Sequence, residues 1–456
     1  MMTRRDFLHG GAAAIVVGAA GSRRPRAAQG DRPRPTAAQL AWQRDEVAIF
    51  IHFGVNTFTD REWGDGKESP TIFAPAPLDA RQWARAARAA GARAMVLTAK
   101  HHDGFCLWPT RTTSHSVAKS PFRGGGGDVV REFVDACRAE DLRPGLYLSP
   151  WDRNSPVYGD SPRYNDLYAE QLTELLTNYG PLAEVWFDGA NGEGPNGKRQ
   201  TYDWPRVWGL VRKLQREAVI FSDAGPDVRW CGNENGIAGD PNWSTMNPDA
   251  VPYPGASGPG IIEALQKGDP AGTVFRPAEA DVSIRPGWFY HRAEDSRVKT
   301  PDRLVDLYFR SVGRNSKLLL NVPPTPAGLL HDADAASLEG FGRQRAALFA
   351  ADLMKPRSGT WLPAGAQAGA AEIDLIGAAA IAVVRVAEDI SQGQRVASHV
   401  VEVSDGDAWR EVARGTTIGY ARLHRIEPIR ARRVRVRVED AVAPPLPLRI
   451  SVFAGA

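Results

Sequence analysis

The middle of the chain alternates between short apolar runs and longer segments in which apolar residues recur at helical spacing. The apolar runs have the length of buried parallel strands and lie at residues 94–99, 145–149, 184–188, 219–222 and 317–322. The segments with helical spacing lie at residues 79–91, 128–140, 163–179, 204–217 and 338–354. Repeated strand–helix units predict a parallel β/α architecture, and the length of this region, 36–354, favours a closed (β/α)8-like TIM barrel.

The pattern changes after residue 355. Short runs then alternate between apolar and polar residues, as at 433–438, where arginine alternates with valine. Such alternation is typical of antiparallel strands with one buried face. We therefore predict a second domain at 356–456, a C-terminal antiparallel β-sandwich.

The first residues have the features of an export signal. Arg4 and Arg5 precede Phe7 and Leu8, an apolar stretch rich in Gly and Ala follows, and small residues stand near Ala28. The paired arginines resemble the twin-arginine type of signal. The apolar stretch is shorter than the roughly 20 residues of a membrane span. We predict that residues 1–29 direct export from a bacterial cytoplasm to the periplasm or the exterior, with cleavage favoured over retention as an anchor and no stable membrane span afterwards.

Composition narrows the class of protein. The net charge is +3, and no basic stripe is interleaved with aromatic residues, which argues against nucleic acid as a partner. The three cysteines, Cys106, Cys137 and Cys231, are widely spaced and match neither a metal-site pattern nor a disulfide framework. The thirteen tryptophans suit sugar binding and core packing alike.

Polar and aromatic residues stand at the ends of successive predicted strands. In a β/α barrel, the loops after the strands converge on one face, and that face carries the chemistry. The residues at these positions are His52, the pair His101 and His102, then Trp151 and Asp152, and finally Trp186 and Asp188.

Each of these residues has a structural alternative. An Asp after a strand often caps the next helix, and a His in an apolar run is often part of the core. The adjacent His101 and His102 would point to opposite sides of a regular strand, so both face one pocket only if the strand has ended or bulged there.

Two other chemistries fit the sequence poorly. Three histidines and an aspartate suit zinc, but the chain has no His-x-His or His-Glu-x-x-His spacing. It has no Gly-x-Ser-x-Gly elbow for a serine nucleophile either. We therefore expect neither a metal nor another cofactor.

A pair of carboxylates fits better. Glycoside hydrolysis uses one carboxylate as nucleophile or base and one carboxylic acid as proton donor, about 5–5.5 Å apart if configuration is retained. Asp188 supplies the first, and Glu234, in a turn flanked by glycines, is a candidate for the second. The other candidates are Asp223, Asp227 and Glu279.

Over nearly all of its mature length, the chain resembles the α-L-fucosidases of glycoside hydrolase family 29. The resemblance is carried by motifs in a characteristic order: His52–Thr59, Glu62–Gly66, Ala99–Phe105, Ser149–Asp152, Trp186–Gly189, Gly232–Gly236, Arg285–His291 and Gly313–Ser316. It implies a distorted β/α barrel with a C-terminal β-sandwich, a fucosylated glycan as substrate, and a retaining two-step mechanism without metal.

The resemblance also assigns roles by position. Asp188 matches the nucleophile and Glu234 the acid/base, and the Gly-Asn-Glu context resembles the branch that cleaves α-1,3 and α-1,4 fucose from Lewis-type glycans. Tyr147 and Trp151 compete for one further pocket position. The residues that match the fucose-binding pocket are His52, Glu62, Trp63, His101, His102, Trp186 and Trp288.

Several alternatives stay open. Arg229, five residues before Glu234, either favours ionised carboxylates nearby or is a structural arginine. In the second domain, either a sugar-binding face or part of the core is formed by Trp361, Trp409 and Tyr420. The alternative functions are a broad α-L-fucosidase acting on α-1,2 links or simple fucosides, and a fucose-binding protein without catalysis. The sequence leaves the natural glycan and the oligomeric state undetermined.

Overall fold

The computed structural model describes residues 32–406 and 408–455. The predicted export signal at 1–29 lies outside these residues. Within them, no helix is both long enough and apolar enough to cross a membrane.

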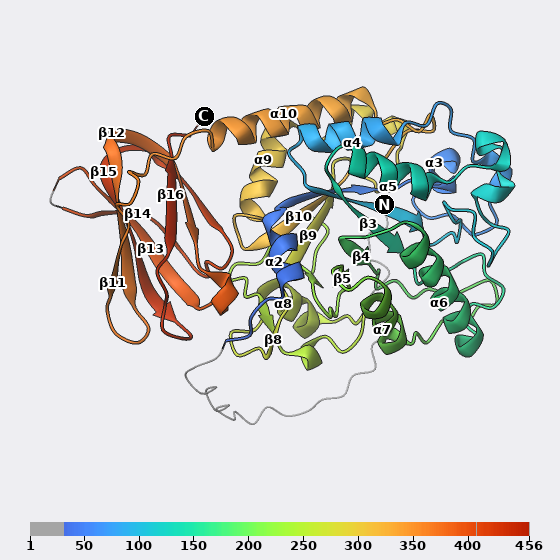
Figure 1. Ribbon diagram of the computed structural model, residues 1–456, viewed down its shortest axis with the longest axis horizontal. Coiled ribbons are helices and arrows are strands. Elements are labelled where there is room, and N and C mark those ends of the chain that lie inside the picture. Colours follow the sequence, from blue (N-terminus) through green and yellow to red (C-terminus); the bar gives the residue numbers. More distant parts are fainter. Residues whose placement is uncertain (1–31, 407, 456) are drawn as a thin grey trace.

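Eight parallel strands form one sheet in the order β5-β4-β3-β2-β1-β10-β9-β6. A parallel bridge between Phe221 and Val228 joins its two ends, so that the sheet is a nearly closed barrel (Figure 1). This confirms the predicted TIM-like barrel. Its strands are β1 (Val47–Ile51), β2 (Ala94–Lys100), β3 (Arg143–Leu148), β4 (Glu184–Trp186), β5 (Val219–Phe221), β6 (Arg229–Trp230), β9 (Ala278–Ser283) and β10 (Ser316–Asn321).

Helices cover the outside of the barrel (Figure 1). Asp79 and Asp128 accept hydrogen bonds from the first turns of α4 and α5, which explains where these two helices begin. The helices are α2 (Ala37–Arg44), α3 (Val55–Thr59), α4 (Ala80–Ala89), α5 (Val129–Ala139), α6 (Ser161–Asn178), α7 (Trp204–Leu214), α8 (Pro259–Lys267), α9 (Pro301–Arg310) and α10 (Asp332–Leu348).

The last helix differs from its predicted position at 338–354. It begins at Asp332, because His331 caps it by accepting a hydrogen bond from the Ala333 N–H. It ends at Leu348. Its first turn carries Asp332 and Asp334, and acids stabilise the first turn of a helix.

Strands β6 and β9 were not predicted. In β9, Glu279 and Asp281 alternate with apolar residues, and all of β9 is buried. Because these carboxylates face the barrel interior, the strand lacks the continuous apolar run by which its neighbours were found.

Because side chains alternate between the inside and the outside of the barrel along each strand, the inward-facing residues form layers. At the amino-terminal ends of the strands, which we call the lower end of the barrel, the buried Glu184, Glu279 and Lys317 meet. Lys317 Nζ lies 3.1 Å from Glu184 Oε2 and 3.8 Å from Glu279 Oε2. Aromatic and aliphatic residues fill the next layer: Phe50, Tyr147, Trp186, Phe221 and Leu319. Two residues further along the same strands, the inward-facing positions carry His52, Asp188 and Asn321. The alternation of side chains therefore places polar groups at the carboxyl ends of the strands.

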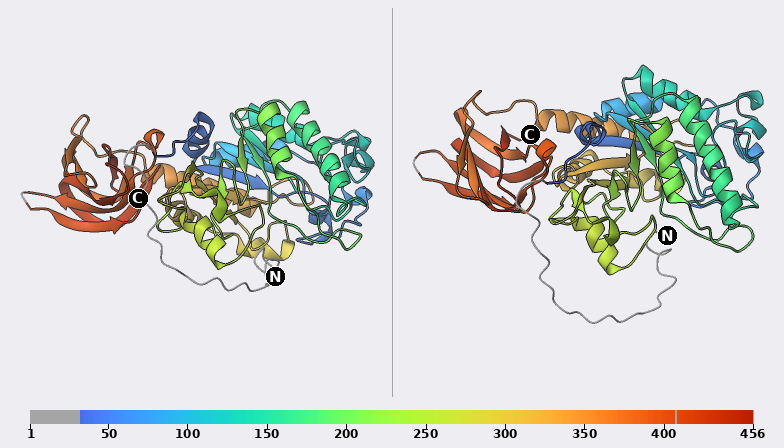
Figure 2. Two further views of the ribbon diagram at one scale, coloured as in Figure 1. Left: turned by 90° about the horizontal axis from the view of Figure 1, so that it is seen from below. Right: turned by 60° about the horizontal axis from the view of Figure 1, so that its bottom comes forward.

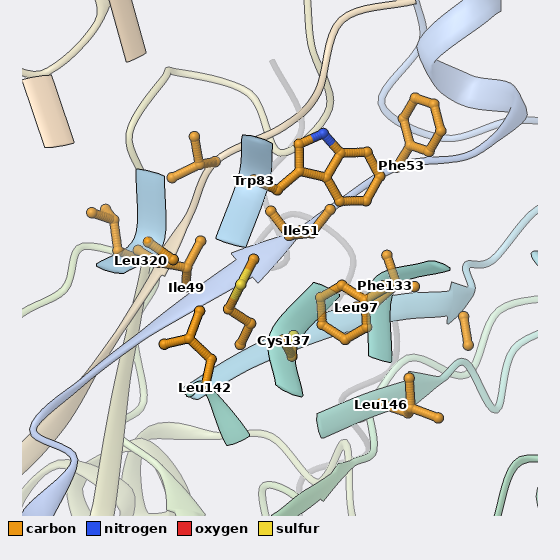
Figure 3. Close-up of a cluster of buried hydrophobic side chains, with 14 of the residues drawn as sticks. Ile49, Ile51, Phe53, Trp83, Leu97, Phe133, Cys137, Leu142, Leu146 and Leu320 are labelled. Carbon is orange, nitrogen blue, oxygen red and sulfur yellow. The ribbon is translucent and has the colours of Figure 1, made fainter. Parts of the chain in front are cut away.

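The alternate residues of the same strands pack outward against the helices. Figure 3 shows Ile49 and Ile51 of β1, Leu97 of β2 and Leu320 of β10 in one buried cluster with the helix residues Trp83 and Phe133. This layer holds the strands in register and so fixes the positions of their carboxyl ends.

The C-terminal domain stands at one end of the barrel (Figures 1 and 2). Its two long strands, β12 and β15, pair with each other, and register shifts divide each into two parts. β11, β13 and β14 extend the sheet from one part, and β16 pairs with the other part of β12. Buried residues such as Val434 and Val436 form the core between the layers, as predicted for a β-sandwich. The strands are β11 (Thr360–Pro363), β12 (Gly369–Ala387), β13 (Val396–Ser404), β14 (Arg410–Gly415), β15 (Arg422–Ala441) and β16 (Arg449–Phe453).

Partly buried polar contacts join the two domains. Glu46, at the start of β1, accepts hydrogen bonds from Tyr420 and Arg385 of the second domain. Arg422 forms a bidentate ion pair with Asp240 at 2.9 Å. Tyr420, one of the three aromatic residues considered above for the second domain, therefore anchors that domain to the barrel.

Candidate active site

A cavity of about 370 Å³ lies at the carboxyl ends of the barrel strands. It collects residues from β1, β4 and β9, from the loops after β1, β2, β4, β6 and β9, and from α9. It is lined by Phe50, His52, Glu62, Trp63, His101, His102, Trp186, Asp188, Glu234, Asn235, Ile237, Asp281, Val282, Ser283, Arg285, Pro286, Trp288, Lys299 and Arg303. Nine of these residues were assigned to the site from the sequence: both carboxylates, the three histidines, Glu62, Trp63, Trp186 and Trp288.

Asp188 lies two residues after the end of β4. Its Oδ1 accepts a hydrogen bond from the Ala190 N–H at 2.7 Å, and its Oδ2 lies 3.5 Å from the Tyr147 hydroxyl in the layer beneath. The side chain is buried, with 8% of the residue exposed. The two contacts hold the carboxylate at the bottom of the cavity, which is where an attacking group must stand.

Glu234 enters the cavity from the loop that follows β6. Asn233 shapes this loop, because its Oδ1 accepts from the Asn235 N–H and its Nδ2 donates to the Ile237 carbonyl at 2.8 Å. The Gly236 N–H donates to the carbonyl of Asp281 on β9. These hydrogen bonds fix the loop internally and to β9. The half-buried Glu234 therefore has a defined position in the same cavity as Asp188.

The ring orientation of His52 is set by β10. Its Nδ1 lies 2.8 Å from Asn321 Oδ1, while Asn321 Nδ2 donates to the Trp288 carbonyl at 2.7 Å and to Ser283 Oγ. Because the amide nitrogen is committed to a carbonyl, the amide oxygen faces His52, and Nδ1 must carry the proton. The ring therefore presents Nε2 to a ligand.

His102 is oriented by a second chain of hydrogen bonds, which runs through Ser149. The Ser149 hydroxyl donates to the Trp151 carbonyl at 2.8 Å, so its oxygen accepts from His102 Nδ1 at 2.7 Å. Trp151 itself packs beside the ring, with centroids 5.1 Å apart, and donates its Nε1 hydrogen to the Glu193 carbonyl. Trp151 thus supports His102 from behind.

His101 and His102 both line the cavity. Strand β2 ends at Lys100, and its pairing with β3 shifts register between Thr98 and Lys100. This bulge removes the strict alternation that would have separated the two rings, which lie 4.1 Å apart. Burial, with the neighbouring His102 and His52, lowers the pKa of His101 well below its usual value.

Glu62 is held by three donors. Its oxygens accept from the backbone N–H groups of Trp288 and Phe289, at 2.9 and 3.2 Å, and from His291 Nε2 at 2.7 Å. His291 Nδ1 lies 2.6 Å from Asp60. Hydrogen bonding to Glu62 raises the pKa of His291 to about 9, with a further contribution from Asp60. A protonated His291 therefore donates a charge-assisted hydrogen bond to Glu62.

Trp186 forms a wall of the cavity. Its ring stacks on Phe221 at 4.3 Å, and its Nε1 donates to Glu279 at 3.0 Å. Burial, followed by the charge of Glu184, raises the pKa of Glu279 well above its usual range. Glu279 thus positions Trp186 from the layer below and does not line the cavity.

Three assigned residues lie outside the cavity lining. The Tyr147 hydroxyl contacts Asp188, and Trp151 packs against His102, so each adjoins the cavity through a residue that lines it. Arg229 is fully buried on β6 and bonds to the carbonyls of Leu265 and Arg276 and to Asn242 Oδ1. The guanidinium therefore bonds to the backbone of α8, to the backbone just before β9 and to Asn242, which agrees with the structural alternative for Arg229.

The remaining acid candidates also have structural partners. Asp227 pairs with Arg212 and accepts from the Ile220 N–H. Asp223, after β5, accepts from the Gly255 N–H at 3.1 Å. Neither residue lines the cavity, which leaves Glu234 as the candidate that does.

Sequence reasoning missed several cavity residues. Asp281, on the unpredicted strand β9, is buried and accepts from Trp230 Nε1 at 2.7 Å. Lys299 lines the cavity and donates to the Ser283 carbonyl at 2.7 Å. The signal was present in β9, where carboxylates alternate with apolar residues, but that pattern is also typical of a solvent-facing strand. Asn321 was missed for a related reason, as the polar end of an apolar run.

The arrangement suits a polyhydroxylated ligand. Carboxylates and histidines bind hydroxyl groups, and the faces of Trp186 and Trp288 offer apolar surface to C–H groups. Within residues 32–406 and 408–455, no group of three or more His, Cys, Asp or Glu side chains is arranged to hold a metal ion.

Comparisons with known proteins agree with this geometry. The family model described as alpha-L-fucosidase matches residues 27–344. The alpha-L-fucosidase 1 of Arabidopsis thaliana is 41% identical over 91% of this chain and 86% of its own length. The crystal structure of SpGH29 superposes with a TM-score of 0.87 at 40% identity, over 94% of this chain and 99% of that chain.

A third relative was solved with a ligand. A Ruminococcus gnavus fucosidase of glycoside hydrolase family 29, in complex with fucose, has a TM-score of 0.83 at 31% identity and covers 98% of both chains. A family match across most of the barrel, and relatives this similar over both domains, show that the protein belongs to the α-L-fucosidases of glycoside hydrolase family 29.

Proposed function

We propose that the protein is an exo-acting, retaining α-L-fucosidase in which Asp188 is the nucleophile and Glu234 the acid/base. The observation that carries this proposal is that the two carboxylates enter the same cavity from different elements, β4 and the loop after β6. Glycoside hydrolysis uses one carboxyl group on each side of the scissile bond, and retention further requires that the two lie about 5–5.5 Å apart.

The reaction then proceeds in two displacements. Asp188 attacks the anomeric carbon while Glu234 gives its proton to the departing glycosidic oxygen, and a fucosyl ester forms on Asp188. Glu234, now ionised, takes a proton from water, and the water oxygen attacks the same carbon and releases Asp188. Two inversions leave the configuration of fucose unchanged.

The pocket accounts for the choice of sugar. Nε2 of His52, oriented by Asn321, and the carboxyl group of Glu62 are suited to hydroxyl groups, whereas the C5 methyl of fucose needs apolar surface of the kind that Trp186 and Phe50 offer. The complex of the Ruminococcus gnavus fucosidase with fucose supports this choice of ligand.

We further propose that the protein prefers α-1,3 and α-1,4 links in branched, Lewis-type glycans. The support is the context of Glu234, in which Gly232 and Asn233 precede it as in that branch of the family. The alternative is a broad α-L-fucosidase. Rates on a Lewis-type trisaccharide, 2′-fucosyllactose and an aryl fucoside distinguish the two, because only the first substrate is favoured by a 1,3/1,4-specific enzyme.

The mechanism is tested by removing each carboxylate. Asp188→Ala is expected to lose at least about 10³-fold in kcat, with azide restoring turnover and giving fucosyl azide of inverted configuration. Glu234→Ala is expected to give fucosyl azide of retained configuration. Glu263→Ala, which removes an exposed carboxylate on α8, is the control. Near-normal turnover by Asp188→Ala would refute the nucleophile assignment.

A fucose-binding protein without catalysis gives a different result. It binds fucose in calorimetry but releases none from any of the three substrates. That outcome would overturn the proposed activity and leave the pocket assignment intact.

Export through the twin-arginine pathway is a separate proposal, supported by Arg4 and Arg5 ahead of the apolar stretch. Fractionation of a bacterium that expresses the full chain tests it. Export is expected for the wild type and lost in a variant with Lys at both positions, and retention of export by that variant would contradict this pathway.

A further inference from the structure

Tyr253 is an exposed aromatic residue on the loop between β7 (Thr245–Met246) and α8. It is 58% exposed, whereas the structure buries nearly all of the other large apolar side chains that it describes. The proposed mechanism does not use this residue. A single exposed ring needs no functional explanation by itself, so its meaning depends on how rigidly it is held and how near it lies to the site.

The loop around Tyr253 is held on both sides. Val251 and Ala256 are buried in the same hydrophobic cluster as Trp186, the wall of the cavity. Between them, the Ala256 N–H donates to the Tyr253 carbonyl at 3.1 Å, and Gly255 has φ +84°, as the third position of a type II turn requires.

The sequence stiffens this turn further. Tyr253 stands between Pro252 and Pro254, and a residue that precedes proline is restricted to extended conformations. The backbone beneath the ring is therefore ordered before a ligand arrives, so that a ligand does not have to pay for ordering it.

The turn contacts the backbone next to the nucleophile. Gly255 packs against Gly189 so closely that a Cβ on Gly189 would lie 2.5 Å from the Gly255 nitrogen. Asp223 strengthens the contact by accepting from the Gly255 N–H. Tyr253 is two residues from this contact, at most about 7.6 Å along the chain, and Asp188 is one residue from it.

We propose that Tyr253 forms the platform of a subsite for the sugar that carries the fucose. The ring would stack on the C–H face of that sugar, an N-acetylhexosamine or hexose, as its fucose branch enters the cavity. This inference rests on the proposed function, because it takes the bond cleaved at Asp188 as its reference point.

The chemistry of the ring fits this role. A sugar has one face of C–H groups, which an aromatic face covers, and hydroxyl groups at its rim, which the phenol of Tyr can approach. Binding at this distance from the reacting carbon holds substrate and transition state alike, so its loss raises KM more than it lowers kcat.

The test compares Tyr253→Ala and Tyr253→Phe on two substrates. A Lewis-type trisaccharide fills both the fucose pocket and the subsite, whereas α-L-fucosyl fluoride has no sugar as its leaving group. We expect Tyr253→Ala to raise KM for the trisaccharide about tenfold and to change kcat/KM for the fluoride less than about twofold. Tyr253→Phe, which keeps the ring, is expected to stay within about threefold of the wild type on both.

Ile376→Ala is the matched control, because Ile376 is 62% exposed and belongs to the second domain. It is expected to behave as the wild type on both substrates. Equal losses by Tyr253→Ala on both substrates, or no loss on the trisaccharide, would overturn the subsite. If the wild type releases fucose from neither substrate, the proposed function fails instead, and the two failures are thereby distinguished.

Discussion

Asn321 fixes the tautomer of His52. The Asn321 side-chain oxygen lies 2.8 Å from His52 Nδ1, and its nitrogen is committed to the Trp288 carbonyl at 2.7 Å. A single amide at the end of β10 therefore orients a sugar-binding histidine and fixes the backbone of a cavity tryptophan. Its removal loosens both groups.

We expect Asn321→Ala to lower kcat/KM by about 10²-fold, because a displacement of a positioning group by about 1 Å has an effect of this size. Steady-state kinetics on α-L-fucosyl fluoride measure the loss. Asn178→Ala, at an exposed position on α6, is the control. Activity close to that of the wild type would show that His52 does not need Asn321 for its orientation.

Gly287 leaves room for Glu62. A Cβ at this position would collide with Glu62 Oε1 and would lie 2.9 Å from His291 Cδ2. We expect Gly287→Ala to displace the Glu62 carboxylate and raise KM for fucosides about tenfold or more. Gly209→Ala on α7 is the control, since nothing lies within 4 Å of a Cβ there, and alanine favours a helix by up to about 1 kcal/mol. A folded Gly287→Ala variant with normal KM would contradict the role of Glu62.

His291 makes stability dependent on pH. Its folded pKa of about 9, raised first by its hydrogen bond to Glu62, exceeds the unfolded value of 6.5. The contribution of the protonated ring to stability is therefore complete below about pH 6.5 and is lost as the pH rises through about 9. We expect the wild-type Tm to fall across this interval relative to the Tm of His291→Gln, as measured by calorimetry. Parallel Tm profiles for the two proteins would refute the assignment.

Lys317 holds two buried carboxylates in the lower barrel. Its Nζ lies 3.1 Å from Glu184 and 3.8 Å from Glu279, and all three residues are buried. We expect Lys317→Met to lower the free energy of unfolding by about 3–5 kcal/mol, because it leaves carboxylates buried without a cation. Urea unfolding measures this change. The double variant Lys317→Met with Glu184→Gln should recover part of the loss. No recovery would mean that the packing of Lys317 Nζ over the Trp42 ring, 4.7 Å from its centroid, matters more than charge.

Local patterns in the sequence determined much of the barrel. Continuous apolar runs located β2, β3, β4, β5 and β10, and capping residues such as Asp79 located the helices between them, because these signals depend on neighbours in the chain. The positions of His52 and Asp188 just after their strands followed from the same patterns. Motif resemblance then related Glu234, Glu62 and Trp288 to the site, although each lies on a loop that periodicity does not place.

Tertiary structure alone decided the inside of the barrel. Glu279 and Asp281 of β9 resemble solvent-facing residues in sequence, and only closure of the sheet turns them inward. Arg229 precedes Glu234 closely in sequence but donates to carbonyls of α8 and of Arg276 and to Asn242, and Tyr147 and Trp151 contact residues that line the cavity. Whether a polar side chain meets solvent, substrate or a buried partner depends on residues far away in the chain, and the local sequence carries no record of that contact.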